Sequence, residues 1–461
     1  MKVKSILSIV IVVILLVSVF AFLPKQNPGE PITPVSTDSP TASPTAVPQS
    51  TSQPSEQPDP LSQISRYLSG VGNTVVQAVV PRTPGLIELA QGMNSAVWRQ
   101  VAANAWQYFQ PDIGVNASTG LPNSGSTYFP YFTDWDLGVY IQAVIDANAT
   151  GLINNDGAWG SSARLEKIVH FLETRELNNA SYPYWFYQSS DGKNYHAMSD
   201  FSTSPIDSVD TGRLFVALNN LRIFNTSLSS RINDIVLYGQ NHNRSNYAAL
   251  VPNIYTDSLS SNSIYAYYVY SGFASFWPNQ LSDVPNRILS NILSSGTTTT
   301  NNITLPISAI LGDPLLCSVF ELNNSSQLMT LMRQVYLAHE AYFNATGVYR
   351  AFSEGGSPSD HWAYEWVVYP DNRTWVILDE KGQPFDTSPI IYTKIAMGFS
   401  AIYNTTYAYS MNVHLEKSLP APSNGYSEGV NEDGIQITGI GSNTNGLIIG
   451  AAKYAMQNNP P

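Results

Sequence analysis

The spacing of apolar residues between residues 86 and 456 constrains the fold more than any other feature of this chain. In eleven segments these residues recur three and four positions apart, as they do along one face of an α-helix. The segments are 86–109, 134–149, 162–177, 209–224, 229–239, 263–276, 284–294, 305–320, 325–343, 390–417 and 443–456. No proline- and serine-rich linker separates them. We therefore expect one large, mainly α-helical domain, although a length of 461 residues alone is typical of two or three domains.

One interval departs from the helical pattern. Residues 348–390 are rich in Tyr, Trp and Val, and two β-prone runs, 366–369 and 374–378, flank turn-forming residues. This predicts a small β-hairpin insert in the helical domain. The helices can pair as hairpins that close into a ring or stack as an open solenoid, and the pattern leaves both arrangements open.

The first 61 residues differ in composition from the rest. Residues 6–23 are uncharged, mostly aliphatic and preceded by Lys2 and Lys4. This predicts a membrane anchor at residues 1–23 whose N-terminus stays in the cytoplasm, with the rest of the chain on the extracellular face. A cleaved signal peptide is the alternative, and the protein would then be secreted. Residues 24–61 carry ten of the 30 prolines, among Ser, Thr and Gln, and predict an extended stalk before a single domain at 62–461.

Sites for N-glycosylation are frequent and fit a glycoprotein of the cell envelope. The Asn-x-Ser/Thr sequences begin at Asn116, Asn148, Asn179, Asn225, Asn243, Asn302, Asn323, Asn324, Asn344, Asn372 and Asn404.

The composition argues against several classes of protein. The net charge of −12 argues against a nucleic-acid-binding protein, which needs a basic surface. The single cysteine, Cys317, cannot form an internal disulfide, and the six histidines lack the spacing of zinc ligands. We expect no metal site and no cofactor, although the Asp- and Asn-rich loops permit calcium without specifying it. The sequence also contains no Gly-x-Ser-x-Gly nucleophile motif.

Acidic residues set among aromatic residues and glycines distinguish this chain. They form five clusters, at 133–138, 206–213, 352–356, 361–366 and 425–434. Sugars are bound by such surfaces, because aromatic faces pack on the C–H faces of a pyranose and carboxylates bind its hydroxyls. Two carboxylates can also cleave the glycosidic bond if one of them stays protonated. The aromatic neighbours of Glu365, Tyr364 and Trp366, are suited to raise its pKa.

Several of these residues also have a purely structural interpretation. Some acidic residues are placed to cap a helix or to favour its dipole, namely Asp134, Asp136, Asp207 and Asp210. Arg213 can simply pair with Asp210, and Trp185 and Trp362 can pack in the core. Both interpretations stay open at this point.

Four short motifs carry a resemblance to a known family. They are Trp135-Asp136-Leu137, Asp210-Thr211-Gly212-Arg213-Leu214, Lys394-Ile395-Ala396-Met397-Gly398-Phe399, and Glu428-Gly429 with Asn443-Thr444-Asn445-Gly446. In this order, over residues 97–454, they resemble the domain-of-unknown-function 3131 family. The family is similar to the six-hairpin glycosidases, so the resemblance implies an (α/α)6 toroid that binds carbohydrate or cleaves glycosides in a central cleft. The chain departs from the pattern at Ile395, where the family has a small residue.

We therefore expect a glycoside hydrolase-like protein that acts on a polysaccharide or glycan. Inversion is expected, with the two carboxyl groups about 6.5–9.5 Å apart. The candidate general acids are Glu354 and Glu365. The candidate bases are Asp136, Asp210 and Glu428. The residues expected to contact the sugar are Trp135, Trp185, Arg213, Trp362, Tyr364, Trp366, Lys394, Tyr426, Asn443 and Asn445.

Two other functions are compatible with these clusters. The first is a non-catalytic glycan-binding or envelope-structural module on the same fold, which needs no opposed pair of carboxylates. The second is a polysaccharide lyase, which the acidic net charge disfavours because its substrate is a polyanion.

Overall fold

The computed structural model describes residues 84–125, 130–195, 208–238, 245–323, 325–358, 362–379 and 381–458. The predicted anchor and stalk lie outside these ranges, as do Asp207 and the start of the predicted domain at residue 62. In the described part of the chain, no helix combines the length and the apolar character needed to cross a bilayer.

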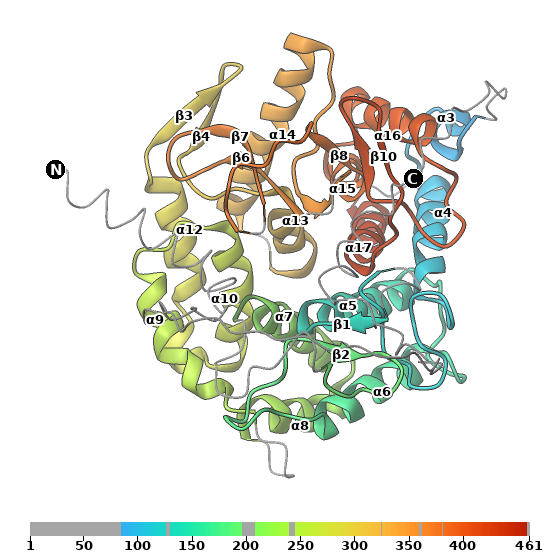
Figure 1. Ribbon diagram of the computed structural model, residues 1–461, viewed down its shortest axis with the longest axis vertical. Coiled ribbons are helices and arrows are strands. Elements are labelled where there is room, and N and C mark those ends of the chain that lie inside the picture. Colours follow the sequence, from blue (N-terminus) through green and yellow to red (C-terminus); the bar gives the residue numbers. More distant parts are fainter. Residues whose placement is uncertain are drawn as a thin grey trace, which may run out of the picture.

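Six helices form a closed inner ring (Figure 1). They are α5 (Asp134–Ala149), α7 (Ser208–Phe224), α10 (Ile264–Phe276), α13 (Gly312–Glu321), α15 (Thr393–Tyr403) and α17 (Ser442–Asn458). Each packs against the next in this order, and α17 packs against α5. This closure excludes the open solenoid.

An outer layer of helices covers the ring. It consists of α4 (Ser95–Trp106), α6 (Ser161–Thr174), α8 (Ser229–Asn233), α12 (Val284–Ser294), α14 (Ser326–Thr346) and α16 (Thr406–Ser418). These pack on α17, α5, α7, α10, α13 and α15, respectively, so each inner helix has one outer partner. Short helices α3 (Leu86–Ala90), α9 (Val251–Ser258) and α11 (Pro278–Leu281) complete the helical part. The architecture is the expected (α/α)6 toroid.

Composition explains which helices lie inside. The inner helix α5 buries 13 of its 16 residues, whereas the outer helix α12 buries only Val284, Ile288, Leu289 and Ile292, a single stripe. Glycines allow the inner helices to touch. A Cβ atom at Gly272 of α10 would lie 2.3 Å from the backbone oxygen of Gly212 of α7. This contact between the two helices therefore does not tolerate a residue larger than glycine at position 272.

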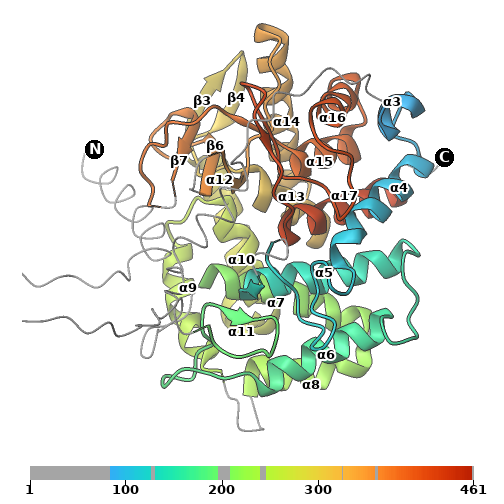
Figure 2. The ribbon, with the colours of Figure 1, turned by 45° about the vertical axis from the view of Figure 1, so that its right-hand side comes forward.

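Short strands extend the toroid on one side, where β3, β4, β6 and β7 lie beside α12 and α14 (Figure 2). The predicted hairpin is confirmed, because β6 (Trp362–Val368) pairs antiparallel with β7 (Thr374–Leu378), with Trp366 opposite Val376. Strand β5 (Glu354–Gly356) pairs with the other edge of β6. A second sheet orders β8 (Ile390–Tyr392), β9 (Gly429–Asn431) and β10 (Gln436–Ile437), and β1 (Tyr131–Phe132) pairs with β2 (Tyr187–Gln188).

Three predicted helices have different bounds, and two short helices were not predicted. The segment 86–109 is divided into α3 and α4, because Gln91 adopts the left-handed conformation that ends α3. The segment 305–320 is helical only from Gly312, because residues before it form the hairpin β3 (Thr297–Thr300) and β4 (Ile303–Pro306) around Asn301 and Asn302, both with positive φ. The segment 390–417 is strand β8 followed by two helices, and α15 ends at Asn404 in the left-handed conformation. Helices α9 and α11 lie in stretches for which no helix was predicted.

Candidate active site

The first turns of four inner helices meet at one buried carboxylate. Asp313 of α13 forms an ion pair with Lys394 of α15 and accepts a hydrogen bond from Nδ2 of Asn443 of α17 at 2.9 Å. Asn443 in turn accepts one from Nε1 of Trp135 of α5 at 3.3 Å. The amino ends of these helices therefore lie at the same end of the toroid, and their dipoles favour negative charge there.

The Asp313–Lys394 pair is completely enclosed, with 0% of either side chain exposed. Burial on its own lowers the pKa of Lys394, but the neighbouring carboxylates of Asp313, Glu428 and Glu354 outweigh it and raise that pKa. Lys394 therefore stays charged and faces three acidic groups.

Glu354 lies in β5 at this same end and is 6% exposed. Burial, and secondarily the negative charge of Asp313, raise its pKa, whereas Lys394 lowers it, and the pKa that results is about 7. The side chains of Tyr265 and Trp362 hydrogen-bond to this carboxyl group. Near neutral pH a large fraction of Glu354 is consequently protonated, which is the state required of a general acid.

Glu428 supplies a second carboxylate beside Glu354. Its Oε2 atom accepts a hydrogen bond from the hydroxyl of Thr444 at 2.8 Å. The pKa of Glu428 is raised by burial, although Lys394 and the Thr444 hydroxyl oppose this effect. A Cβ atom at Gly355 would lie 3.0 Å from Oε2 of Glu428 and 2.7 Å from the ring of Tyr392, so Glu428 lies against the backbone that follows Glu354. The φ of 158° at Gly355 adds to this requirement for glycine.

Two other predicted carboxylates, Asp136 and Asp210, also lie in the first turns of inner helices. Asp136 belongs to a capping box, in which it accepts hydrogen bonds from the Thr133 backbone at 3.0 Å and from the Ser442 hydroxyl at 2.8 Å. Burial raises its pKa to about 6. Asp210 is half-buried in the first turn of α7.

Glu365 is on the opposite face of β6 from Tyr364, the residue directly opposite Glu354 in the sheet. Its Oε1 atom accepts a hydrogen bond from the backbone N–H of Ile390 at 2.8 Å, and burial raises its pKa well above the usual range. The strand register therefore separates Glu365 from Glu354, the other candidate acid, although they are eleven residues apart in sequence.

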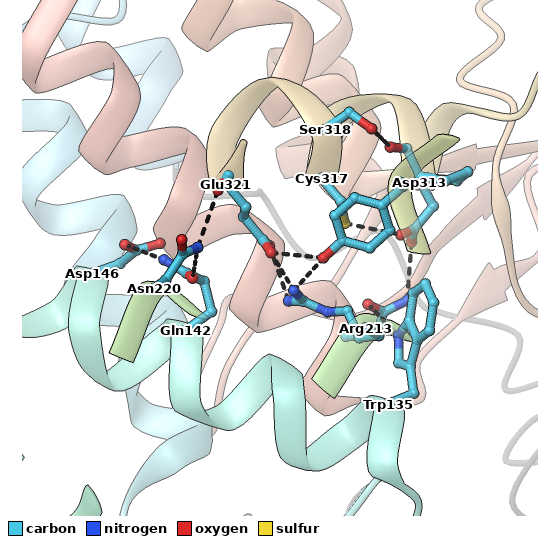
Figure 3. A network of polar contacts seen from close by, with 12 residues as sticks. Trp135, Gln142, Asp146, Arg213, Asn220, Asp313, Cys317, Ser318 and Glu321 are labelled. Atoms are coloured by element: carbon cyan, nitrogen blue, oxygen red, sulfur yellow. Dashed lines mark hydrogen bonds and ion pairs between the residues drawn. The ribbon is translucent and has the colours of Figure 1, made fainter. Parts of the chain in front are cut away.

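A network of polar contacts extends from the site along the inner helices, from Asp313 in the first turn of α13 to Glu321 at its end (Figure 3). Arg213 forms an ion pair with Glu321 and donates to the hydroxyl of Tyr268, which also donates to Glu321 at 2.7 Å. Arg213 therefore pairs with Glu321, at the opposite end of α13 from Asp313. A further layer links Asn220, Gln142, Asp146 and Lys453.

The predicted sugar-contacting aromatic residues fall into two groups. Trp135, Trp362 and Tyr364 are half-buried near Glu354, and the Trp135 ring lies 6.1 Å from that of Tyr265. Trp366 is 2% exposed and packs in a small cluster with Leu311 and Leu378, so it serves the core.

Three more residues predicted to contact the sugar have structural partners of their own. Trp185 is half-buried with its ring 4.8 Å from that of Phe186. Asn445 is fully buried and holds the backbone of Tyr426 through hydrogen bonds of 2.7 and 3.2 Å. Tyr426 itself is half-buried, and its hydroxyl accepts a hydrogen bond from Asn104 at 3.4 Å.

Comparison with known proteins identifies the family. Residues 100–458 match the model of the family described as protein of unknown function (DUF3131). The chain belongs to this family. No curated protein matches the sequence significantly.

Solved structures share the fold of this family member at low identity. An endo-β-1,2-glucanase mutant from Talaromyces funiculosus in complex with β-1,2-glucan has a TM-score of 0.54 and 13% identity, with 81% of this chain and 90% of that chain covered. The enzyme from Chitinophaga pinensis, in complex with sophorotriose and glucose, has a TM-score of 0.50 and 13% identity, with 80% and 96% covered. A provisionally assigned glucoamylase from Bacteroides caccae has a TM-score of 0.50 and 16% identity, with 79% and 97% covered. These similarities show that the chain shares the toroid fold of these proteins.

The central residue of the site, Asp313, was missed by sequence reasoning. It follows Gly312 and precedes Pro314, an arrangement typical of a helix start, and the segment was instead assigned to the interior of a longer helix. A predicted helix start at Gly312 would have put Asp313 in the first turn of its helix, as Trp135, Lys394 and Asn443 are in theirs. In the described part of the chain, no group of three or more His, Cys, Asp or Glu side chains is arranged to hold a metal ion.

Proposed function

We propose that the protein is a membrane-anchored extracellular glycoside hydrolase that inverts the configuration of its substrate, with Glu354 as general acid and Glu428 as general base. The observation that carries the proposal is that two buried carboxyl groups, Glu354 and Glu428, lie side by side and both face the charged Lys394. Burial raises the pKa of both groups, to about 7 at Glu354, and the charge of Lys394 opposes this effect. A protonated and an ionised carboxyl group are the two components that glycoside hydrolysis needs.

The surroundings support these roles. Glu354 is held by Tyr265 and Trp362, which fix the carboxyl group that would protonate the leaving oxygen. Oε2 of Glu428 is held by Thr444, and Oε1 has no hydrogen-bond partner among the described residues, so this atom is available to activate a water molecule. Asp313 has a positioning role, because both its oxygens are engaged and its side chain is completely buried.

The test uses the full-length protein, purified in detergent and incubated with a panel of neutral glucans that includes β-1,2-glucan, the ligand of one structural neighbour. We expect release of reducing ends, with the first-formed anomer, followed by NMR, opposite to that of the cleaved bond. Glu354→Gln and Glu428→Gln should each lower kcat at least a thousandfold. Glu166→Gln, at an exposed glutamate on the outer helix α6, is the control and should retain full activity.

Two outcomes would contradict the proposal. Turnover that survives both substitutions would exclude these residues as the catalytic pair. Binding of a glucan without any turnover would instead identify a glycan-binding module on the same toroid.

A further inference from the structure

A pocket of about 440 Å³ opens on the outer wall of the toroid, far from the carboxylate cluster. It lies between the end of α4, the loop that follows α5 and the start of α6, and is lined by Trp106, Gln107, Gln110, Ile153, Trp159 and Arg164, among others. The candidate active site is at the first turn of α5, whereas Ile153 follows its last turn. Sixteen helical residues, about 24 Å, separate the two ends.

The floor of this pocket is a buried arginine with only neutral partners. Arg164 is 1% exposed, and its guanidinium lies between the rings of Trp106 and Trp159, with Cζ 4.9 Å from each ring centre. Its Nε atom donates to the backbone oxygen of Trp159 at 2.8 Å, and Nη1 donates to Tyr140 and to the Phe109 backbone, both at 2.8 Å. Within the described ranges no carboxylate pairs with Arg164, and its Nη2 has no hydrogen-bond partner.

Burying a cation without a counter-ion costs free energy of folding. The groups around Arg164 make the local electrostatic potential still more positive. Arg164 lies in the first turn of the 14-residue helix α6, where the helix dipole disfavours a cation. Lys167, one turn further on, places its Nζ 4.4 Å from the centre of the Trp159 ring and has no acidic partner among the described residues. Two cations thus flank one tryptophan without a counter-ion in a protein whose net charge is −12.

The rest of the lining suits a hydroxylated ligand. The side-chain amides of Gln107 and Gln110 donate to helix backbone oxygens at 3.4 and 3.3 Å. This leaves their Oε1 atoms, which have no partner in the described part of the chain, as acceptors for hydroxyl groups. The indole of Trp159 is half-buried and offers an apolar edge.

We propose that this pocket is a second carbohydrate-binding site that takes an acidic sugar residue, with the sugar carboxylate on Nη2 of Arg164 and its hydroxyls on the two glutamines. A carboxylate supplies the missing counter-charge, and charge-assisted hydrogen bonds to arginine are among the strongest available. The site is independent of the proposed catalysis and serves to hold an acidic glycan on the outside of the toroid.

The test measures binding of glucuronate and of glucose to the full-length protein by saturation-transfer NMR. We expect glucuronate to bind at least tenfold more tightly than glucose. Gln110→Glu places a carboxylate beside Arg164 without disturbing the core and should weaken glucuronate binding at least tenfold. Gln100→Glu is the matched control, since it makes the same charge change on α4 at an exposed residue outside the pocket, and should leave the affinity unchanged.

A second readout needs no ligand. If Arg164 lacks a counter-charge, Gln110→Glu supplies one and should raise the Tm, whereas Gln100→Glu should not. Equal binding of glucose and glucuronate, or loss of glucuronate binding in the Gln100→Glu control as large as in Gln110→Glu, would overturn the proposal. Because both readouts are binding and stability, their failure is separate from any loss of glycoside hydrolysis.

Discussion

Replacing Lys394 with methionine tests whether the buried ion pair organises the candidate site. Lys394 and Asp313 are both completely buried, so removing one partner leaves an uncompensated charge in the interior. Such a change typically costs about 3–5 kcal/mol of the free energy of unfolding. Asp313 keeps its hydrogen bond from Asn443 at 2.9 Å, which offsets part of the loss. We therefore expect Lys394→Met to cost about 3 kcal/mol at pH 7.

The assay is urea unfolding followed by tryptophan fluorescence for the wild type, Lys394→Met, Asp313→Leu and the double variant. Each single variant leaves one charge unpaired, whereas the double variant replaces both charges by apolar side chains. The double variant should lose at least about 2 kcal/mol less than the sum of the single losses. The control is Lys417→Met, which breaks an exposed pair with Glu88 and should cost no more than about 1 kcal/mol.

Two results would refute this reasoning. Additive losses in the cycle would show that the two side chains do not stabilise each other. A loss for Lys394→Met as small as that for Lys417→Met would show that the pair is not buried as described.

Three further predictions concern pH and helix capping. If Glu354 is the general acid, turnover should fall about tenfold per pH unit above its pKa of about 7, and a rate that stays constant to pH 9 would exclude this role. Burial lowers the pKa of His339 from 6.5 to about 4, so its contribution to stability is present above pH 6.5 and is lost as the pH falls through 4. Between pH 7 and 4 the wild type should therefore lose about 3 kcal/mol more than His339→Gln in urea unfolding, and parallel pH profiles would contradict this. Thr133→Ala removes the N-cap of α5, whose side-chain oxygen accepts from the Trp135 backbone at 3.1 Å, and should cost about 1 kcal/mol, whereas Thr133→Ser should cost almost nothing.

Much of the toroid could be predicted from local patterns. The helix over 134–149 was predicted with the bounds that the structure gives, because apolar spacing is a local signal, although the structure has Thr133 rather than Asp134 as the N-cap. Errors arose where local signals conflict. In 390–417 the apolar spacing continues across Asn404, which the structure shows in the left-handed conformation that ends α15. In 305–320 the helical spacing masked the strand that ends at Pro306.

The site was only partly predictable for a different reason. Glu354, Glu428 and Trp135 were candidates because they lie in the clusters of acidic and aromatic residues, whereas Lys394 and Asn443 were candidates through the motifs that resemble the family. Their association through Asp313 could not be foreseen, since the partners are separated by 81 residues from α13 to α15 and by 130 to α17.

The sequence by itself determined that this chain forms amphipathic helices, with carboxylates and aromatic residues at their amino ends. These features depend on hydrogen bonds and side-chain spacing within one or two turns. Only the tertiary structure decided which carboxylates share a site. Glu354 and Glu365 both have aromatic neighbours in the sequence or in the fold, but strand pairing turns them to opposite faces of the sheet, because side chains alternate along a strand. Ring closure brings Asp313 and Lys394 together beside Glu354, where burial has the largest effect on the pKa of Glu354 and the opposite charges of the pair raise and lower it, respectively.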